Sequence, residues 1–364
     1  MYQLTVPVYS PAWNQMAAKD WGVDSTDDLE LVLSSPYKIA ALPALCSLQY
    51  HFTYCEASSS IPFDKFDLVI LTDIEYSRLS AIHEWINQVG IKHYVLAVGG
   101  LHMNESLNES CELYRPWWCY NLLRFNEYRD TSSSNKSFQF EALLGARRPH
   151  RDYVMLGLQN NNMLGQSIVT YRDVFYGGFE DPCTEQVKQQ FPDNELIWPY
   201  ISLNLRPEWE VCSEITNSVS PFMPYGIYQN TNYSIVCETL AGYTEFFMSE
   251  KTSKVFMAKR VFVIFANYQF LKNLKSIGFQ TFDSVIDESY DNVLDTVTRY
   301  AQAFEQVKWL SKQSADLIYK KLKPVLDHNH NRLFSLRDQT QQHMKELLRQ
   351  HIPANHWKCL SNEI

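Results

Sequence analysis

The residues best suited to chemistry are Glu238 and the run Ser249-Glu250-Lys251-Thr252-Ser253-Lys254. A carboxylate at the end of a strand can accept both hydroxyls of a ribose, a geometry that few other side chains supply. A lysine beside a helix N-terminus can hold a diphosphate, because the helix dipole and the ammonium group both favour negative charge. Ser249 is expected to cap a helix that begins near Glu250. The alternative is that Ser249 and Glu250 only start a helix and that Lys251 and Lys254 are solvated.

The densest basic cluster in the chain is Arg147-Arg148-Pro149-His150-Arg151. Arg147 and Arg151 are four residues apart, so they would share one face of a helix, and in a turn they would still converge on one phosphate. The alternative is a solvated basic turn at a domain junction.

Three residues are candidates for a general base that deprotonates an acceptor hydroxyl: Asp73, Glu75 and His102. Asp73 and Glu75 follow a predicted strand at 66–72, and His102 follows a second predicted strand at 93–98. Ligands of open α/β sheets bind at the carboxyl ends of strands, where a base would be useful. The alternatives are that Asp73 caps the next helix and that His102 is a loop residue.

The elements that must position these residues follow an α/β pattern. Apolar residues at helical spacing over 75–89 separate the strands at 66–72 and 93–98, which indicates a parallel sheet. Further along, a predicted strand at 233–237, the helix after Ser249 and a strand at 260–265 form a second such unit. The carboxyl end of its first strand carries Glu238.

The polar segment 130–137 is the best candidate for a domain boundary, although a surface loop inside one domain has the same composition. We therefore predict an N-terminal acceptor domain at 1–137 and a C-terminal donor domain at 138–315. Residues 316–364 are expected to form C-terminal helices. In one arrangement these helices pack back on the N-terminal domain.

Composition narrows the class of protein. The 364 residues are 45% hydrophobic, enough for a packed core, and the formal net charge of −9 argues against a general polyanion binder. Neither a leader peptide nor a stretch of about 18–20 apolar residues is seen, and none of the eight cysteines forms a C-x-x-C pair. We therefore expect a cytoplasmic protein without a membrane span.

Several common motifs are absent from the sequence: the phosphate-binding G-x-x-x-x-G-K-[ST], the dinucleotide-binding G-x-G-x-x-G, the hydrolase G-x-S-x-G and the zinc-binding H-E-x-x-H. The D-x-D pair is also absent, with Asp73-Ile74-Glu75 as the nearest approach, and no convincing metal site is seen. ATPase, dehydrogenase, serine hydrolase and zinc protease functions lose support.

The chain resembles the donor domain of fucosyltransferase-like GT-B glycosyltransferases over about 138–335. The resemblance rests on the run from Ser249 to Lys254, the strand Phe262-Val263-Ile264-Phe265, the segment from Leu271 to Phe282 and the run Ile286-Asp287-Glu288-Ser289-Tyr290-Asp291. The cluster 147–151 and His328-Asn329 also fit the pattern. One departure is the turn Ala266-Asn267-Tyr268-Gln269, where the family usually carries glycine or proline.

The resemblance implies two Rossmann-like domains that face a cleft, with a nucleotide-diphosphate sugar as co-substrate and no cofactor or metal ion. It implies that Glu250 binds the ribose or sugar of the donor and that Glu238 faces the donor. It further implies that Lys251, Lys254 and Arg151 offset the charge of the departing diphosphate; Arg147 and Ser249 complete the predicted donor site. By analogy the transfer to an acceptor hydroxyl inverts the anomeric carbon.

The acceptor is a glycan, a protein or a modified nucleic acid. One alternative is a glycosyltransferase that acts on a hydroxymethylated DNA base, which would need base flipping and a basic groove. Another is a non-catalytic GT-B-like module that binds carbohydrate or protein.

Overall fold

The structure is a computed structural model that describes residues 2–10, 24–44, 61–73, 79–102, 105–116, 123, 127–132, 136–171, 186–187, 189–192, 195–197, 200–202, 223–239, 241 and 245–359. The chain divides into two compact units. The first comprises Met1–Trp117, Glu245–Phe247 and Leu336–Ile364, and the second comprises Trp118–Thr244 and Met248–Ser335. The predicted boundaries at 137 and 315 differ from these divisions.

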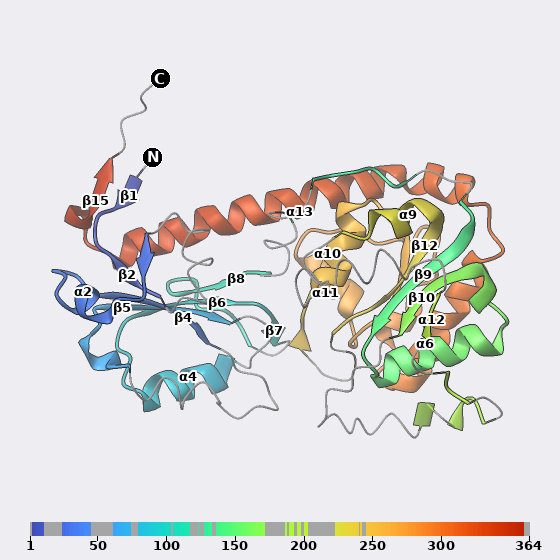
Figure 1. Ribbon diagram of the computed structural model, residues 1–364, viewed down its shortest axis with the longest axis horizontal. Coiled ribbons are helices and arrows are strands. Elements are labelled where there is room, and N and C mark those ends of the chain that lie inside the picture. Colours follow the sequence, from blue (N-terminus) through green and yellow to red (C-terminus); the bar gives the residue numbers. More distant parts are fainter. Residues whose placement is uncertain are drawn as a thin grey trace. The chain divides into compact units, whose positions relative to one another are not determined.

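The first unit contains a six-stranded sheet in which every pairing is parallel. Its strands, in spatial order, are β3 (Ser25–Thr26), β2 (Val8–Tyr9), β4 (Ile39–Ala44), β5 (Leu68–Asp73), β6 (Tyr94–Val98) and β8 (Glu112–Tyr114). Helices α2 (Leu29–Leu33) and α4 (Leu79–Gln88) belong to the same unit (Figure 1). The predicted strands at 66–72 and 93–98 therefore exist, as neighbours in a parallel sheet.

Helix α4 explains how the chain covers one side of this sheet. Its buried residues Leu79, Ile82, Trp85 and Ile86 recur at helical spacing and pack in one apolar cluster with β4, β5 and β6. A second cluster joins the same strands to the end of the C-terminal helix α13 (Ala315–His351). The chain ends pair as β1 (Tyr2–Leu4) with β15 (Trp357–Cys359), and β7 (Leu101–His102) pairs with β13 (Glu245–Phe246).

The second unit contains a five-stranded sheet, of which Figure 1 labels β9, β10 and β12. Its spatial order is β11 (Tyr200–Ile201), β10 (Ser167–Tyr171), β9 (Phe138–Gly145), β12 (Thr231–Cys237) and β14 (Phe262–Phe265). Only the β10–β11 pairing is antiparallel among these described strands. Counted along the chain within this sheet, the order is 3-2-1-4-5, the order of dinucleotide-binding folds.

The helices of this unit connect and cover those strands. They are α6 (Pro149–Asn160), α9 (Tyr225–Asn230), α10 (Glu250–Met257), α11 (Phe270–Ser276), α12 (Thr296–Leu310) and the part of α13 up to Ser335. Gly157 lets α6 approach α12 closely, because a Cβ atom there would lie 2.6 Å from the ring of Phe304. None of the described helices of the chain is both long and apolar enough to cross a membrane.

Candidate functional site

The candidate site lies at the carboxyl ends of β9 and β12, two central neighbours of the second unit's sheet. After β9 the chain passes to β10 on one side, and after β12 it passes to β14 on the other. Such a point, where the strand order reverses, is where open α/β sheets bind ligands. Six of the seven predicted donor residues lie in the loops and first helical turns that follow these two strands, and Lys254 lies one turn further along α10.

The turn from β9 into α6 carries the basic cluster. Gly145 has a left-handed backbone with φ of +66°, and Arg148 is the N-cap of the helix that begins at Pro149. Arg147 therefore precedes α6 and Arg151 lies within its first turn, so the two arginines do not share a helix face.

Arg151 is a buried cation with few partners. Its side chain is 5% exposed, and its Nη1 donates to the carbonyl oxygen of Ala146 at 2.8 Å. Its Nε atom has no hydrogen-bond partner among the described residues. Burial, with the charge of Arg148 as the second cause, lowers the pKa of Arg151 to about 10, so it remains protonated at neutral pH.

Arg147 has a different environment. Its Nη2 donates to Oδ2 of Asp152 at 2.9 Å, and the hydroxyl of Tyr171 donates to the other carboxylate oxygen of Asp152. The charge of Arg147 is thus offset by Asp152 inside the protein, whereas that of Arg151 is not offset by a direct ion pair among the described residues. From their spacing in the sequence, both arginines were equally good candidates for binding a phosphate.

Helix α10 begins as the sequence predicts. Ser249 is the N-cap, and its hydroxyl accepts a hydrogen bond from the backbone N–H of Lys251 at 3.2 Å. Glu250 is the first helical residue and is buried. The Nζ of Lys251 donates to Oε1 of Glu250 at 2.8 Å and to Oγ1 of Thr239 at 3.2 Å.

The charges of this first turn are coupled. Burial acts to raise the pKa of Glu250, but Lys251 and Lys254 outweigh it, so the pKa of that carboxyl is lowered and it stays ionised. Lys254 is buried one turn further along, and its charge offsets a small part of the rise in pKa that burial imposes on Glu141 in β9. Lys254 thus acts on one carboxyl at the site and on another inside the sheet.

Glu238 does not present its carboxylate to a ligand. Its side chain is fully buried, and Oε2 accepts from the backbone N–H of Thr239 at 3.0 Å. Its carboxylate also accepts from the backbone N–H of Ser249, at 3.2 and 3.3 Å, and from the hydroxyl of Thr252. These contacts connect the end of β12 to the start of α10.

Two residues complete this arrangement, His150 and Thr252, which were named from the sequence only as members of their runs and were given no role. The Nε2 of His150 donates to the carbonyl oxygen of Glu238 at 2.7 Å. Burial, then the charges of Arg151 and Arg148, hold the pKa of His150 well below its ordinary value, so the ring is neutral at pH 7. The available signal was Pro149, because proline is favoured at the first position of a helix and therefore places His150 in the first turn.

The three candidate bases lie in the first unit, and the structure describes them in part. Asp73 is the last residue of β5, and His102 belongs to β7, where it pairs with Glu245. The side chains of Asp73 and His102 and the whole of Glu75 lie outside the described part of the chain. Their role as bases stays a prediction.

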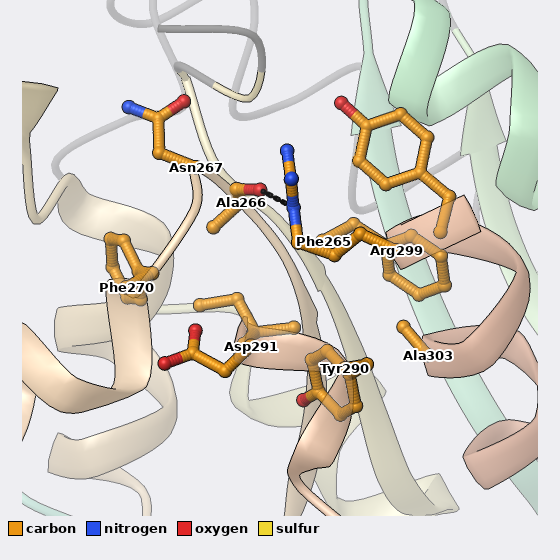
Figure 2. Close-up of a pocket in the computed structure, with 10 residues that line it drawn as sticks. Phe265, Ala266, Asn267, Phe270, Tyr290, Asp291, Arg299 and Ala303 are labelled. Atoms are coloured by element: carbon orange, nitrogen blue, oxygen red, sulfur yellow. Dashed lines mark hydrogen bonds between the residues drawn. The ribbon is translucent and has the colours of Figure 1, made fainter. Parts of the chain in front are cut away.

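A small pocket lies beyond the end of β14, at the turn Ala266–Gln269 where the family pattern breaks. Figure 2 shows Arg299 reaching the carbonyl oxygen of Ala266, and Asp291 accepts from the backbone N–H groups of Leu271 and Lys272 at 2.9 and 3.0 Å. The space between these side chains has no room for even a water-sized group, so it does not admit a ligand. Its charged side chains therefore hold the turn and the start of α11.

His328 and Asn329, which also fitted the family pattern, support the backbone between α11 and the following turn. Nε2 of His328 donates to the carbonyl oxygen of Gly278 at 2.9 Å, and the amide of Asn329 exchanges two 2.8 Å hydrogen bonds with the backbone of Gln280. Among the described residues, no group of three or more His, Cys, Asp or Glu side chains is placed to hold a metal ion.

No protein-family model matches this chain, and no curated protein matches its sequence.

Proposed function

We propose that the protein is a glycosyltransferase that moves a sugar from a nucleotide-diphosphate sugar to an acceptor hydroxyl. The observation that carries the proposal is Arg151, a buried cation whose Nε has no partner among the described residues, at the strand-order reversal between β9 and β12. Burial and Arg148 lower the pKa of Arg151 while the carboxyls of Glu250 and Glu238 act to raise it, so Arg151 lies near the end of β12 and the start of α10. A buried charge is stable only when it is paired, and a diphosphate is a suitable partner.

The surroundings of Arg151 favour an anion over a neutral ligand. The N-termini of α6 and α10 both lie at this edge of the sheet, and their dipoles add positive potential. Arg148 and Lys251 add two further cations, of which Lys251 already bonds Glu250. Together these groups can offset the charge that develops on a departing diphosphate.

Glu250 suits the ribose or the sugar of the donor. Its lowered pKa keeps it ionised at neutral pH, and an ionised carboxylate only accepts hydrogen bonds. Sugar hydroxyls can therefore donate to it, while Lys251 fixes one of its oxygens. In this proposal Glu238 holds the start of α10 through Ser249 and Thr252 and does not contact the donor.

The reaction is a displacement at the anomeric carbon. A lone pair of the acceptor oxygen forms the new bond as the bond from the anomeric carbon to the diphosphate oxygen breaks, and the diphosphate leaves with that electron pair. The hydroxyl proton passes to a base, for which Asp73, Glu75 and His102 are the candidates. The proposal assigns the donor to the second unit and the acceptor to the first, as in the GT-B arrangement that the resemblance implies.

A donor screen tests the proposal without knowledge of the acceptor. The protein is incubated with a panel of nucleotide sugars, and slow hydrolysis and the thermal shift by GDP, UDP and ADP are measured. Hydrolysis of one donor, with stabilisation by the matching nucleoside diphosphate, is expected. Stabilisation without turnover of any donor would indicate a nucleotide-binding module. If none of the three nucleoside diphosphates stabilises the protein, the proposed glycosyltransferase activity is contradicted.

A further inference from the structure

Glu238 connects three parts of the chain through its carbonyl oxygen and its carboxylate. Its carbonyl oxygen accepts from His150 in the first turn of α6, and its carboxylate accepts from Ser249 and Thr252 at the start of α10. The backbone N–H of Thr239 holds the same carboxylate from the chain that follows β12. One residue at a strand end thus binds the first turns of both helices that flank the site.

This arrangement fixes the charges that the donor would meet. Arg151 follows His150 directly in α6, and Glu250 and Lys251 follow Ser249 directly in α10. A shift of either helix start relative to β12 would therefore move one set of charges relative to the other. Displacements of this kind are costly for ligand binding, because bound groups must be held within about 0.5 Å of their productive geometry.

We propose that Glu238 is a positioning residue, which acts through its contacts with His150, Ser249 and Thr252 to set the spacing between Arg151 and the Glu250–Lys251 pair. The inference rests on the proposed function, because it assumes that this edge binds a diphosphate. It assigns to Glu238 a role different from direct contact with the donor, and it extends the site to Thr252 and His150.

Thr252 provides the sharpest test, since it is fully buried and bonds the carboxylate through its hydroxyl. Thr252→Val removes the hydroxyl at nearly constant volume, and Thr252→Ser keeps it. Binding of inorganic pyrophosphate is measured by calorimetry well below the melting temperature of each variant. We expect Thr252→Val to weaken binding about tenfold and Thr252→Ser to stay within about twofold of the wild type.

Ser253→Ala is the matched control, because Ser253 is a fully buried neighbour in α10 whose hydroxyl bonds the carbonyl oxygen of Ser249. It should lower the melting temperature without changing the affinity for pyrophosphate. If Thr252→Val only lowers the melting temperature, or if Thr252→Ser binds as weakly as Thr252→Val, Glu238 has a structural role alone and the inference is overturned. If the wild type itself does not bind pyrophosphate, the proposed function fails and the inference falls with it.

A second pair of variants decides the question if Thr252→Val does not fold. His150→Phe removes the donor to the carbonyl oxygen of Glu238, and His150→Gln retains an N–H group. Weaker pyrophosphate binding in His150→Phe than in His150→Gln supports the positioning role. Equal affinities in these two variants contradict it.

Discussion

Two buried arginines at opposite ends of the same sheet have different surroundings. Arg260 precedes β14 at the amino end and is fully buried; its Nε donates to Ser234 at 3.0 Å, and its Nη atoms donate to the carbonyl oxygen and hydroxyl of Thr231 at 2.5 and 3.0 Å. A further bond of 2.9 Å joins Nη1 to the carbonyl oxygen of Tyr228. Arg151, at the carboxyl end, has one such bond among the described residues, to Ala146.

The difference separates a structural charge from one that is suited to a ligand. Arg260 has hydrogen bonds at each of its three nitrogens, and its charge offsets part of the rise in pKa that burial imposes on Glu141. Arg151 carries the same charge with an unpaired Nε and no direct carboxylate partner among the described residues. Because an uncompensated buried charge is costly, the molecule would gain from an anion at Arg151 and not at Arg260.

The largest effect is expected from Arg260→Met. The substitution leaves the acceptors on Thr231, Ser234 and Tyr228 unpaired and deprives Glu141 of its neighbouring cation, so the free energy of unfolding should fall by about 3–5 kcal/mol. Urea denaturation measures the change. Arg151→Met is the matched variant and should change stability by no more than about 1 kcal/mol; equal losses in both variants would remove the contrast between the two arginines.

Arg151→Met should instead act on ligand binding. We expect the affinity for pyrophosphate and for nucleoside diphosphates to fall about 10- to 100-fold, because a charged hydrogen bond contributes about 1.5–3 kcal/mol. Binding of the corresponding nucleoside should hardly change. Calorimetric titration of both ligands checks this, and equal losses for diphosphate and nucleoside would mean that Arg151 does not contact the phosphates.

The amino end of the sheet should show a pH dependence of stability. Burial raises the pKa of Glu141 to about 7, so between pH 4.5 and pH 7 the folded protein binds this proton more tightly than the unfolded chain does. Glu141 therefore makes the free energy of unfolding decrease as pH rises through that window. Glu288, with a pKa of about 7 and burial as the main cause, acts in the same direction.

Glu141→Gln isolates the first of these two contributions. Urea denaturation at several pH values should show a smaller decrease in stability between pH 4.5 and pH 7 than in the wild type. If the free energy of unfolding of Glu141→Gln depends on pH as strongly as that of the wild type, Glu141 does not titrate between pH 4.5 and pH 7.

The smallest effect is expected from Arg147→Ala. Because Asp152 already offsets the charge of Arg147 at 2.9 Å, its loss should reduce pyrophosphate affinity by no more than about threefold. The same titration that is used for Arg151→Met measures it. A loss as large as that of Arg151→Met would show that the ion pair with Asp152 opens when the ligand binds.

The sequence predicted much of the local structure and less of the pairing between distant residues. The serine cap at Ser249, the helix from Glu250 and the predicted parallel strands of both units all follow from local patterns, and the structure contains them. Which arginine is neutralised does not follow from spacing, because Asp152 reaches back from inside α6 to Arg147.

Glu238 shows the same limit over a longer distance. Its partners Ser249 and Thr252 lie 11 and 14 residues away, and His150 lies 88 residues away. A buried glutamate at a strand end has the same appearance in a sequence whether it faces a ligand or a neighbouring helix. Only the folded arrangement distinguishes the two roles.

The most direct test of the central claim is a crystal structure of the protein with the nucleoside diphosphate that gives the largest thermal shift. The account predicts a diphosphate at the carboxyl ends of β9 and β12, with oxygens within about 3 Å of the Arg151 guanidinium and of the first turn of α10. A diphosphate bound elsewhere, for example at the turn Ala266–Gln269, or an Arg151 without contact to the ligand, would contradict it.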